Sequence, residues 1–188
     1  MDDPLITLAA TDFELFEVPA QFAQDRALLD SRWKSLQRQA HPDRFAAQGG
    51  AAQRVATQWS VRINEAYQRL KDPLKRAGYL CELAGAPVNA ESNTAMPAPF
   101  LVQQMQWREA LDEAANSADV AALSRSLTQV RDETLARCEQ LLDVQHDAKA
   151  AVAEVRALMF IERFARDLEQ RGWQLEARQP ACGAGGQE

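Results

Sequence analysis

The chain is poor in the residues that bind metals or form covalent cross-links. Its 188 residues include three cysteines, Cys81, Cys138 and Cys182, and two histidines, His41 and His146. An odd number of widely spaced cysteines indicates a reducing compartment, and none of these residues has the C-x-x-C or H-x-x-x-H spacing of a zinc site. We therefore expect no cofactor and no structural metal. Cys138 continues a helical apolar row, which predicts a small residue of the core.

Long apolar runs are also missing. No stretch approaches the ~18 uninterrupted apolar residues that a membrane-spanning helix needs, and the first twenty residues hold acids but no lysine or arginine, unlike a signal peptide. We therefore expect a cytoplasmic protein with no membrane partner. With 8 glycines, 8 prolines and 46% hydrophobic residues, the composition argues against a collagen or a disordered chain. The length suits one large domain or two small ones.

The formal net charge of −6 conceals a basic segment. Residues 1–24 hold five acidic residues and no basic one, whereas residues 25–76 hold eleven Lys and Arg against five Asp and Glu, a net charge of +6. The remainder is acidic again, with a net charge of −7. A cluster of one sign steers encounter with a surface of the opposite sign. Nucleic acid is a poor candidate partner, because the acidic flanks oppose it and no aromatic stacking platform accompanies the basic residues.

Hydrophobic periodicity is helical almost throughout, and no segment reads as a convincing strand. A helix over about 25–40 ends at Pro42, because proline disfavours helical geometry in the residue before it. A loop with Gly49-Gly50 leads to a second helix, which should pack antiparallel to the first, and Asp72-Pro73 starts a shorter third helix. The apolar stripes of the two long helices are Leu29, Trp33, Leu36 and Ala40, then Val55, Trp59, Ile63, Ala66 and Leu70.

The second half is predicted to be a separate helical unit. Residues 85–99 hold three prolines, two asparagines, one serine and one glycine, which indicates a linker. A helix follows from Phe100, then a long one with a cap at Asn116-Ser117 and apolar residues from Val120 to Leu141, and a last helix over about 147–171. We expect an all-α protein with a domain over residues 1–84, a linker over 85–99, a helical bundle over 100–175 and a disordered tail over 176–188.

A tripeptide, His41-Pro42-Asp43, stands where the first long helix ends. Pro42 stiffens the turn, and Asp43 presents acceptor oxygens to an arginine of a partner. Taken alone, His41 and Asp43 also fit a helix stop with a local turn cap. The partner-binding interpretation gains from further motifs at a suitable separation: Ile63-Asn64-Glu65-Ala66-Tyr67 with Leu70, Asp72-Pro73, Arg76-Ala77 and Tyr79-Leu80.

Together these motifs resemble a J-domain, in which the tripeptide lies between two long antiparallel helices. The resemblance implies binding to the ATPase domain of a DnaK-class chaperone and stimulation of its ATP hydrolysis, so that the chemistry belongs to the partner. The residues implied to contact the chaperone are His41, Pro42, Asp43, Arg32, Lys34, Arg38 and Arg44.

The helix that begins at Phe100 has more apolar residues than one face needs. At about 100° per residue, Leu101, Val102 and Met105 gather on one face, with Glu109 beside them. Two interpretations stay open: central burial of the helix, or an exposed apolar patch that binds a partner. The other face carries Phe100, Gln104, Trp107, Leu111 and Ala114. The last helix has a similar surplus, with Ala151, Val155, Leu158 and Met159 on one side and Phe160, Phe164 and Leu168 largely on the other.

This half resembles the HscB co-chaperones of iron–sulfur cluster assembly, as does the opening Thr11-Asp12-Phe13-Glu14-Leu15-Phe16. The resemblance covers roughly residues 11–173. It implies a J-domain linked to a three-helix bundle that binds the scaffold protein IscU and brings it to the chaperone HscA. The residues implied to bind the scaffold are Leu101, Val102, Met105, Glu109, Glu113 and Phe160.

Two residues depart from the family pattern, and their effects differ. Gln106 stands where the family often has an acid, which weakens the polar part of the patch, and Arg44 replaces the more usual lysine after the tripeptide but keeps its charge. The N-terminal cysteine pairs of some eukaryotic relatives are missing, which favours a bacterial-type protein without metal.

Two alternatives have to be weighed against this interpretation. A general J-protein that delivers unfolded clients is disfavoured because the chain has no Gly/Phe-rich linker and no cysteine-rich module. An enzyme is disfavoured because Glu109, Asp112 and Glu113 share one side of a helix, as in di-metal bundles, without a Glu-x-x-His partner on another helix. His146 falls in a predicted loop between helices, where it is more readily solvated than catalytic.

Overall fold

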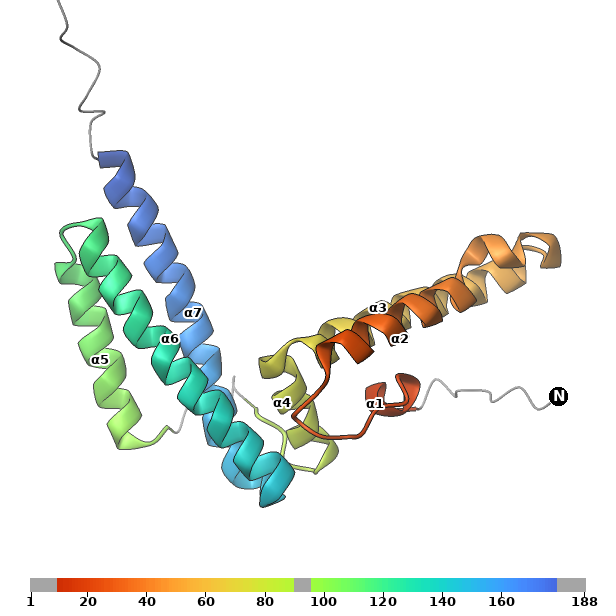
Figure 1. Cartoon of the computed structure of the whole chain (residues 1–188), viewed down its shortest axis with the longest axis horizontal. Coiled ribbons are helices and arrows are strands. Elements are labelled where there is room, and N and C mark those ends of the chain that lie inside the picture. The colour runs from red at the N-terminus through yellow and green to blue at the C-terminus, as the bar shows by residue number, and fades with distance from the viewer. Residues whose placement is uncertain (1–9, 90–95, 179–188) are drawn as a thin grey trace, which may run out of the picture. The chain divides into compact units, whose positions relative to one another are not determined.

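The computed structural model describes residues 10–89 and 96–178, and within these ranges the chain is helical with no strand. The all-α prediction is confirmed. Residues 90–95 of the predicted linker and residues 179–188 of the predicted tail, with Cys182, lie outside the described residues. No helix of the described ranges is long and apolar enough to cross a membrane. The elements are α1 (Asp12–Leu15), α2 (Arg26–Ala40), η1 (Pro42–Gln48), α3 (Gly50–Lys71), α4 (Pro73–Leu83), α5 (Ala98–Glu113), α6 (Ser117–Glu139), η2 (Gln140–Val144) and α7 (Ala148–Arg178) (Figure 1).

The chain forms two compact units that are not simply its two halves. The first unit consists of the residues up to Pro87 together with Glu139–Ala148, and the second consists of Val88–Cys138 with the residues from Lys149 onward. A short piece from late in the sequence therefore belongs to the first unit.

The first unit is built on an antiparallel pair, α2 and α3. The indole N–H of Trp33 donates to the side-chain oxygen of Asn64 at 2.9 Å, and the side-chain amide of Gln37 donates to the carbonyl of Ser60 at 3.1 Å. The Ser60 hydroxyl in turn donates to the carbonyl of Ala40 at 3.0 Å. Along these contacts the residue numbers on α2 increase while those on α3 decrease. The two helices therefore run in opposite directions, as predicted.

The prediction that Val55 belongs to the buried stripe of the second long helix is wrong. Ala40, the last residue of α2, lies opposite Ser60, so the first turns of α3 extend past the end of α2. Val55 lies in these turns and is 53% exposed. The predicted loop after α2 is instead a 3₁₀ helix, η1, and Gly49 joins it to α3 with a φ of +92°, a conformation that glycine adopts without strain.

A buried ion cluster holds α1 against α3. The carboxylate of Asp12 is fully buried and pairs with Arg62 at 2.6 Å and with Arg69 at 2.9 Å, both on α3. The backbone N–H of Asp12 donates to the hydroxyl of Tyr79 on α4 at 3.0 Å. Asp12 therefore ties three helices together, and its neighbour Phe13 enters the core that α2 and α3 share.

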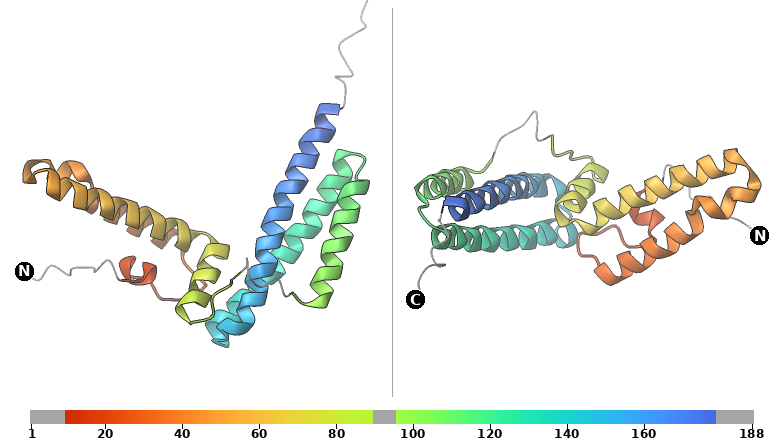
Figure 2. Two further views of the ribbon diagram at one scale, coloured as in Figure 1. Left: turned by 180° about the vertical axis from the view of Figure 1, so that it is seen from behind. Right: turned by 90° about the horizontal axis from the view of Figure 1, so that it is seen from above.

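The second unit is a bundle of three helices, as predicted. α5 and α7 point in the same direction and α6 runs against them, and all three lie side by side in each view (Figures 1 and 2). The side chain of Asn116 caps α6 by accepting the backbone N–H groups of Ala118 and Asp119. The core gathers Trp107, Leu127, Ile161, Phe164 and Leu168.

Two helix boundaries of the second unit differ from the sequence expectation. α5 begins at Ala98, inside the range predicted as linker, because Pro97 can precede a helix and Pro99 fits its first turn. α7 extends to Arg178, past the predicted end at residue 171. Both apolar sides of α7 supply buried residues, such as Leu158 and Phe164, although Met159 is exposed.

Candidate functional site

The tripeptide forms the junction between α2 and η1. His41 leaves the helical conformation with a ψ of 124°, and Pro42 is the first residue of η1. The ring nitrogen Nδ1 of His41 accepts the backbone N–H of Asp43 at 3.3 Å. The carboxylate of Asp43 points away from the fold, with its side chain 89% exposed and Oδ2 3.6 Å from the same ring nitrogen. Asp43 is therefore exposed to solvent, while His41 shapes the turn that carries it.

The four predicted cations beside the tripeptide divide into two groups. Arg44 donates from Nη1 to the carbonyl of Arg38 at 3.1 Å, and Arg32 forms an ion pair with Glu17. These two guanidinium groups hold parts of the first unit together. The side chains of Lys34 and Arg38 are exposed and line a shallow groove of about 400 Å³ with Ser31, Trp33 and Gln37.

A hydrogen-bonded network fixes the first turns of α2 to α3. The Tyr67 hydroxyl donates to Asp30 at 2.7 Å, and Arg26 pairs with the same carboxylate at 2.8 Å. The bond from Tyr67 is the main cause of a pKa of Asp30 below its ordinary value, and it raises the pKa of Tyr67. The helix that carries the exposed cations is thus anchored at its N-terminal end.

The surplus apolar face of α5 is exposed. Leu101 is 44% exposed, Val102 54% and Met105 71%. On the opposite face, Trp107 is buried against α7, so α5 is not buried on all sides. Central burial of α5 is therefore excluded, and its surplus apolar residues form an exposed patch. Glu109 and Glu113 are exposed farther along the helix.

Phe160, the sixth predicted scaffold-binding residue, belongs to an aromatic cluster of the core. Its ring stacks on Trp107 with centroids 6.3 Å apart and on Phe164 at 5.8 Å, and it meets Phe100 edge-on at 5.8 Å. The guanidinium of Arg108 covers another part of the ring, 5.7 Å from its centroid. Phe160 is half-buried and packs against Phe100 and Trp107 of α5, whereas Met105 is exposed.

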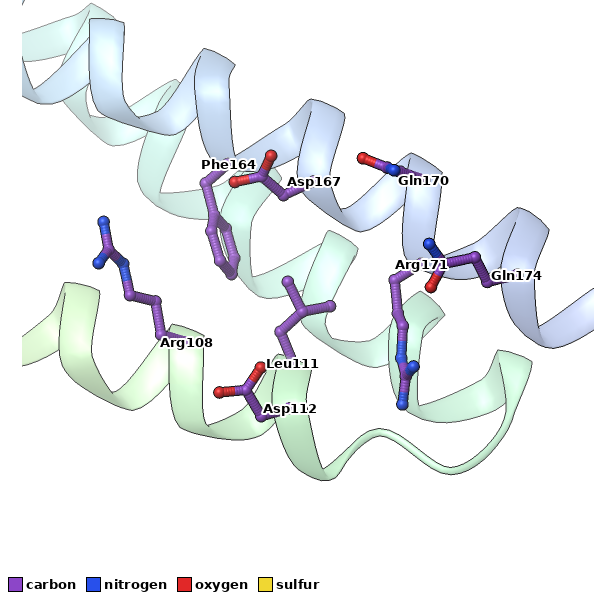
Figure 3. Close-up of a pocket in the computed structure, with 8 residues that line it drawn as sticks. All are labelled: Arg108, Leu111, Asp112, Phe164, Asp167, Gln170, Arg171 and Gln174. Atoms are coloured by element: carbon purple, nitrogen blue, oxygen red, sulfur yellow. The ribbon is translucent and has the colours of Figure 1, made fainter.

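A groove of about 490 Å³ lies between α5 and α7 beyond Phe160. Leu111 and Phe164 extend into the space between the helices, and charged and amide side chains surround them (Figure 3). Arg171 donates to the carbonyl of Ala114 at 2.9 Å. No sequence pattern indicates this groove, because charged residues spaced four apart on a helix are typical of a solvated face. It is lined by Arg108, Leu111, Asp112, Phe164, Asp167, Gln170, Arg171 and Gln174, whose charges balance.

Among the described residues, the remaining candidate chemical groups do not gather into a site. Within residues 10–89 and 96–178, no three His, Cys, Asp or Glu side chains come together as metal ligands. Cys81 and Cys138 are buried, and burial raises the pKa of the Cys81 thiol to about 11, which keeps it protonated. His146 is exposed in the turn before α7, as expected.

Known proteins share this architecture along most of the chain. The family model described as the HSCB C-terminal oligomerisation domain matches residues 96–169. A co-chaperone protein HscB homolog of Burkholderia multivorans is 52% identical over 167 residues, which are 87% of this chain and 95% of the relative. The structure of the chaperone HscB from Vibrio cholerae is 36% identical, with a TM-score of 0.75, and the match covers 88% of this chain and 99% of that one. Human co-chaperone protein HscB has the same fold, with a TM-score of 0.83 at 24% identity over 93% of this chain and 86% of that one.

An antiparallel helix pair that ends in an exposed His-Pro-Asp turn, joined to a three-helix bundle, defines a co-chaperone of the J-domain class. Such a protein works together with a chaperone of the DnaK class. The chain belongs to the HscB family of co-chaperones, and its role lies in iron–sulfur cluster assembly.

Proposed function

We propose that this protein stimulates the ATPase of an HscA-type DnaK-class chaperone and delivers the iron–sulfur scaffold IscU to it. The first unit contacts the chaperone through Asp43, with Lys34 and Arg38 as the solvent-facing cations. The second unit binds the scaffold through the exposed face of α5. Neither surface performs chemistry on a substrate, so the protein acts by bringing two partners together.

One observation carries the scaffold-binding half of the proposal. Three large apolar side chains, Leu101, Val102 and Met105, are exposed on the face of α5 that the bundle core leaves free. A contiguous exposed apolar surface marks a site of protein contact, and methionine adapts its shape to a partner. Exposed Glu109 and Glu113 supply a polar rim.

The chaperone-binding half rests on the geometry of the tripeptide turn. A carboxylate that is 89% exposed in the turn after α2 is accessible to a partner's guanidinium. Lys34 and Arg38 lie on the helix that leads to this turn, so a partner surface that is acidic around one arginine matches them in charge.

The deciding experiment measures ATP hydrolysis by the HscA-type chaperone with this protein and IscU, added separately and together. We expect each to stimulate hydrolysis weakly and the two together to stimulate it far more than the product of their separate effects. Stimulation by this protein that IscU does not increase beyond the product of the separate effects would contradict scaffold delivery and favour a general J-protein for unfolded clients. No stimulation in any mixture would contradict the chaperone-binding half as well.

A further inference from the structure

We propose that Asp143 is a positioning residue of the first unit and that it holds the backbone that leads into α2. Its carboxylate accepts two consecutive backbone N–H groups, that of Phe22 at Oδ1 over 2.6 Å and that of Ala23 at Oδ2 over 2.8 Å. Asp143 lies about 120 residues farther along the chain than the segment it holds. The inference rests on the proposed function, because it is α2 that carries the cations and ends at the tripeptide.

The local backbone explains how Asp143 reaches this segment. α6 continues into η2, a single turn of π-helix over Gln140–Val144. The turn then closes with Gln145 donating to the carbonyl of Gln140 at 3.0 Å and Asp147 donating to that of Leu141 at 2.8 Å. A π-turn inserts one residue into the helical repeat and so rotates the side chains that follow it, and such turns are frequent at functional positions. If α6 continued as an α-helix, the side chain of residue 143 would point in a different direction.

A buried arginine, Arg76, also contacts the held segment. The guanidinium of Arg76 covers the ring of Phe22 at 5.1 Å from its centroid and donates to the carbonyl of Leu70. Burial lowers the pKa of Arg76, and the negative charges of Asp72 and Asp143 oppose that shift. Arg76 therefore contacts the ring of Phe22, while Asp143 accepts its backbone N–H.

A second hydrogen bond joins the segment 139–148 to α4. The thiol of Cys81 donates to the carbonyl of Ala148 over 3.6 Å, and both residues belong to the first unit. The segment 139–148 thus contacts the connection before α2 and also α4. Since α2 begins at Arg26, capped by Asp25, the two amides held by Asp143 lie directly before its first turn.

The test uses the full chain and three variants: Asp143→Asn, Asp143→Glu and the control Glu139→Gln, which changes an exposed acid of the same segment. Hydrogen exchange is followed at the amides of Phe22 and Ala23 and, as a check of folding, at Ile63 and Leu70 in α3. Asparagine keeps one acceptor oxygen without the negative charge and replaces the other with an NH2 group that cannot accept an N–H, so one bond is lost and the other is weakened. We therefore expect Asp143→Asn to exchange about tenfold faster or more at Phe22 and Ala23. Asp143→Glu, which keeps a carboxylate, should retain more protection than Asp143→Asn, and Glu139→Gln should match the parent.

Stimulation of the chaperone ATPase gives the functional result. Asp143→Asn should raise the concentration needed for half-maximal stimulation and leave the maximal rate unchanged, because the tripeptide itself is intact. Unaltered exchange at Phe22 and Ala23 would overturn the inference, as would equal loss in Asp143→Asn and Asp143→Glu with α3 still protected. Faster exchange with unaltered stimulation would refute the positioning role. Failure of the parent protein to stimulate would instead refute the proposed function, without touching the exchange result.

Discussion

Arg44 donates a hydrogen bond from its guanidinium to the backbone carbonyl of Arg38 at 3.1 Å, spanning the His41-Pro42-Asp43 turn. The bond satisfies a carbonyl at the end of α2 that has no partner within the helix, and it places a positive charge at the negative end of the helix dipole. Arg44 therefore stabilises the turn that presents Asp43, in addition to any contact it makes with a partner.

This arrangement predicts a graded response to substitution of Arg44. Arg44→Lys keeps a cation that can donate to the same carbonyl, so we expect half-maximal ATPase stimulation within about threefold of the parent. Arg44→Ala removes both the donor and the charge and should raise the half-maximal concentration by about tenfold. Titrations of ATPase rate with each variant measure this. Equal behaviour of the alanine and lysine variants would show that the bond is unimportant for docking.

Asp43→Asn is expected to abolish stimulation without affecting the fold. The side chain is 89% exposed, so its replacement removes no packing, and an amide lacks the charge that a partner's guanidinium requires. Thermal melting and far-ultraviolet circular dichroism should match the parent, while the ATPase rate stays at the chaperone's basal level. Glu82→Gln on α4, also exposed in the first unit, is the control and should stimulate normally. Stimulation retained by Asp43→Asn would refute the role of the tripeptide.

The helices of this protein follow from local signals in the sequence. Asp72 and Asn116 cap α4 and α6 as their positions before Pro73 and Ser117 predict. Helical periodicity depends on neighbours three and four residues apart, so a single sequence contains it in full. The exposure of Val55 could not be predicted in this way. Val55 lies on α3, but its exposure depends on where another helix, α2, ends.

The long-range polar contacts could not be predicted in this way. Asp12 contributes to the acidic N-terminal segment in the sequence, but in the fold it is a buried partner of Arg62 and Arg69. Asp143 likewise lies in a segment that reads as the end of a helix. No spacing rule links residues 50 or 120 positions apart, so only the tertiary structure reveals that these carboxylates hold other parts of the chain.

Asp12→Asn should destabilise the first unit. The side chain is fully buried, and its loss of charge leaves Arg62 and Arg69 without their partner, which costs about 3 kcal/mol for a buried pair. We place the effect at the lower end of that class because Arg69 is 41% exposed and keeps contact with water. Urea unfolding monitored in the first unit gives the value. Asp132→Asn, an exposed acid of α6, should change stability by less than about 0.5 kcal/mol.

The network around Asp30 predicts an acid-dependent loss of stability. Since the hydrogen bond from Tyr67 lowers the pKa of Asp30 in the folded state, the contribution of this group is fully present above its ordinary value of 3.8. It is lost as the pH falls below that value and through the lowered pKa of the folded state. Thermal melts between pH 2 and pH 6 should therefore converge for the parent and Asp30→Asn at low pH and diverge at high pH. A constant difference across this range would contradict the assignment.

Met105 and Phe160 are predicted to behave differently, although the family resemblance implies scaffold binding for both. Met105 is 71% exposed, so Met105→Ala should leave the melting temperature of the bundle unchanged. As a hot spot of the patch, Met105 should weaken binding to IscU by about 1–3 kcal/mol when truncated, or roughly fivefold to 140-fold in Kd. Calorimetry measures the affinity, with Trp173→Ala as the control because Trp173 is also exposed but lies outside the patch.

Phe160→Ala should lower binding and stability together. Its ring contacts Phe100, Trp107 and Phe164, and removing it opens a cavity in the aromatic cluster that supports α5. Truncation of a half-buried phenylalanine should cost about 2 kcal/mol or more in unfolding free energy. Phe160→Leu fills more of that space, so it should recover much of the stability. If Leu also restores the affinity for IscU, Phe160 acts by holding α5 in place, whereas persistent weak binding in a stable variant means that the ring itself contacts the scaffold.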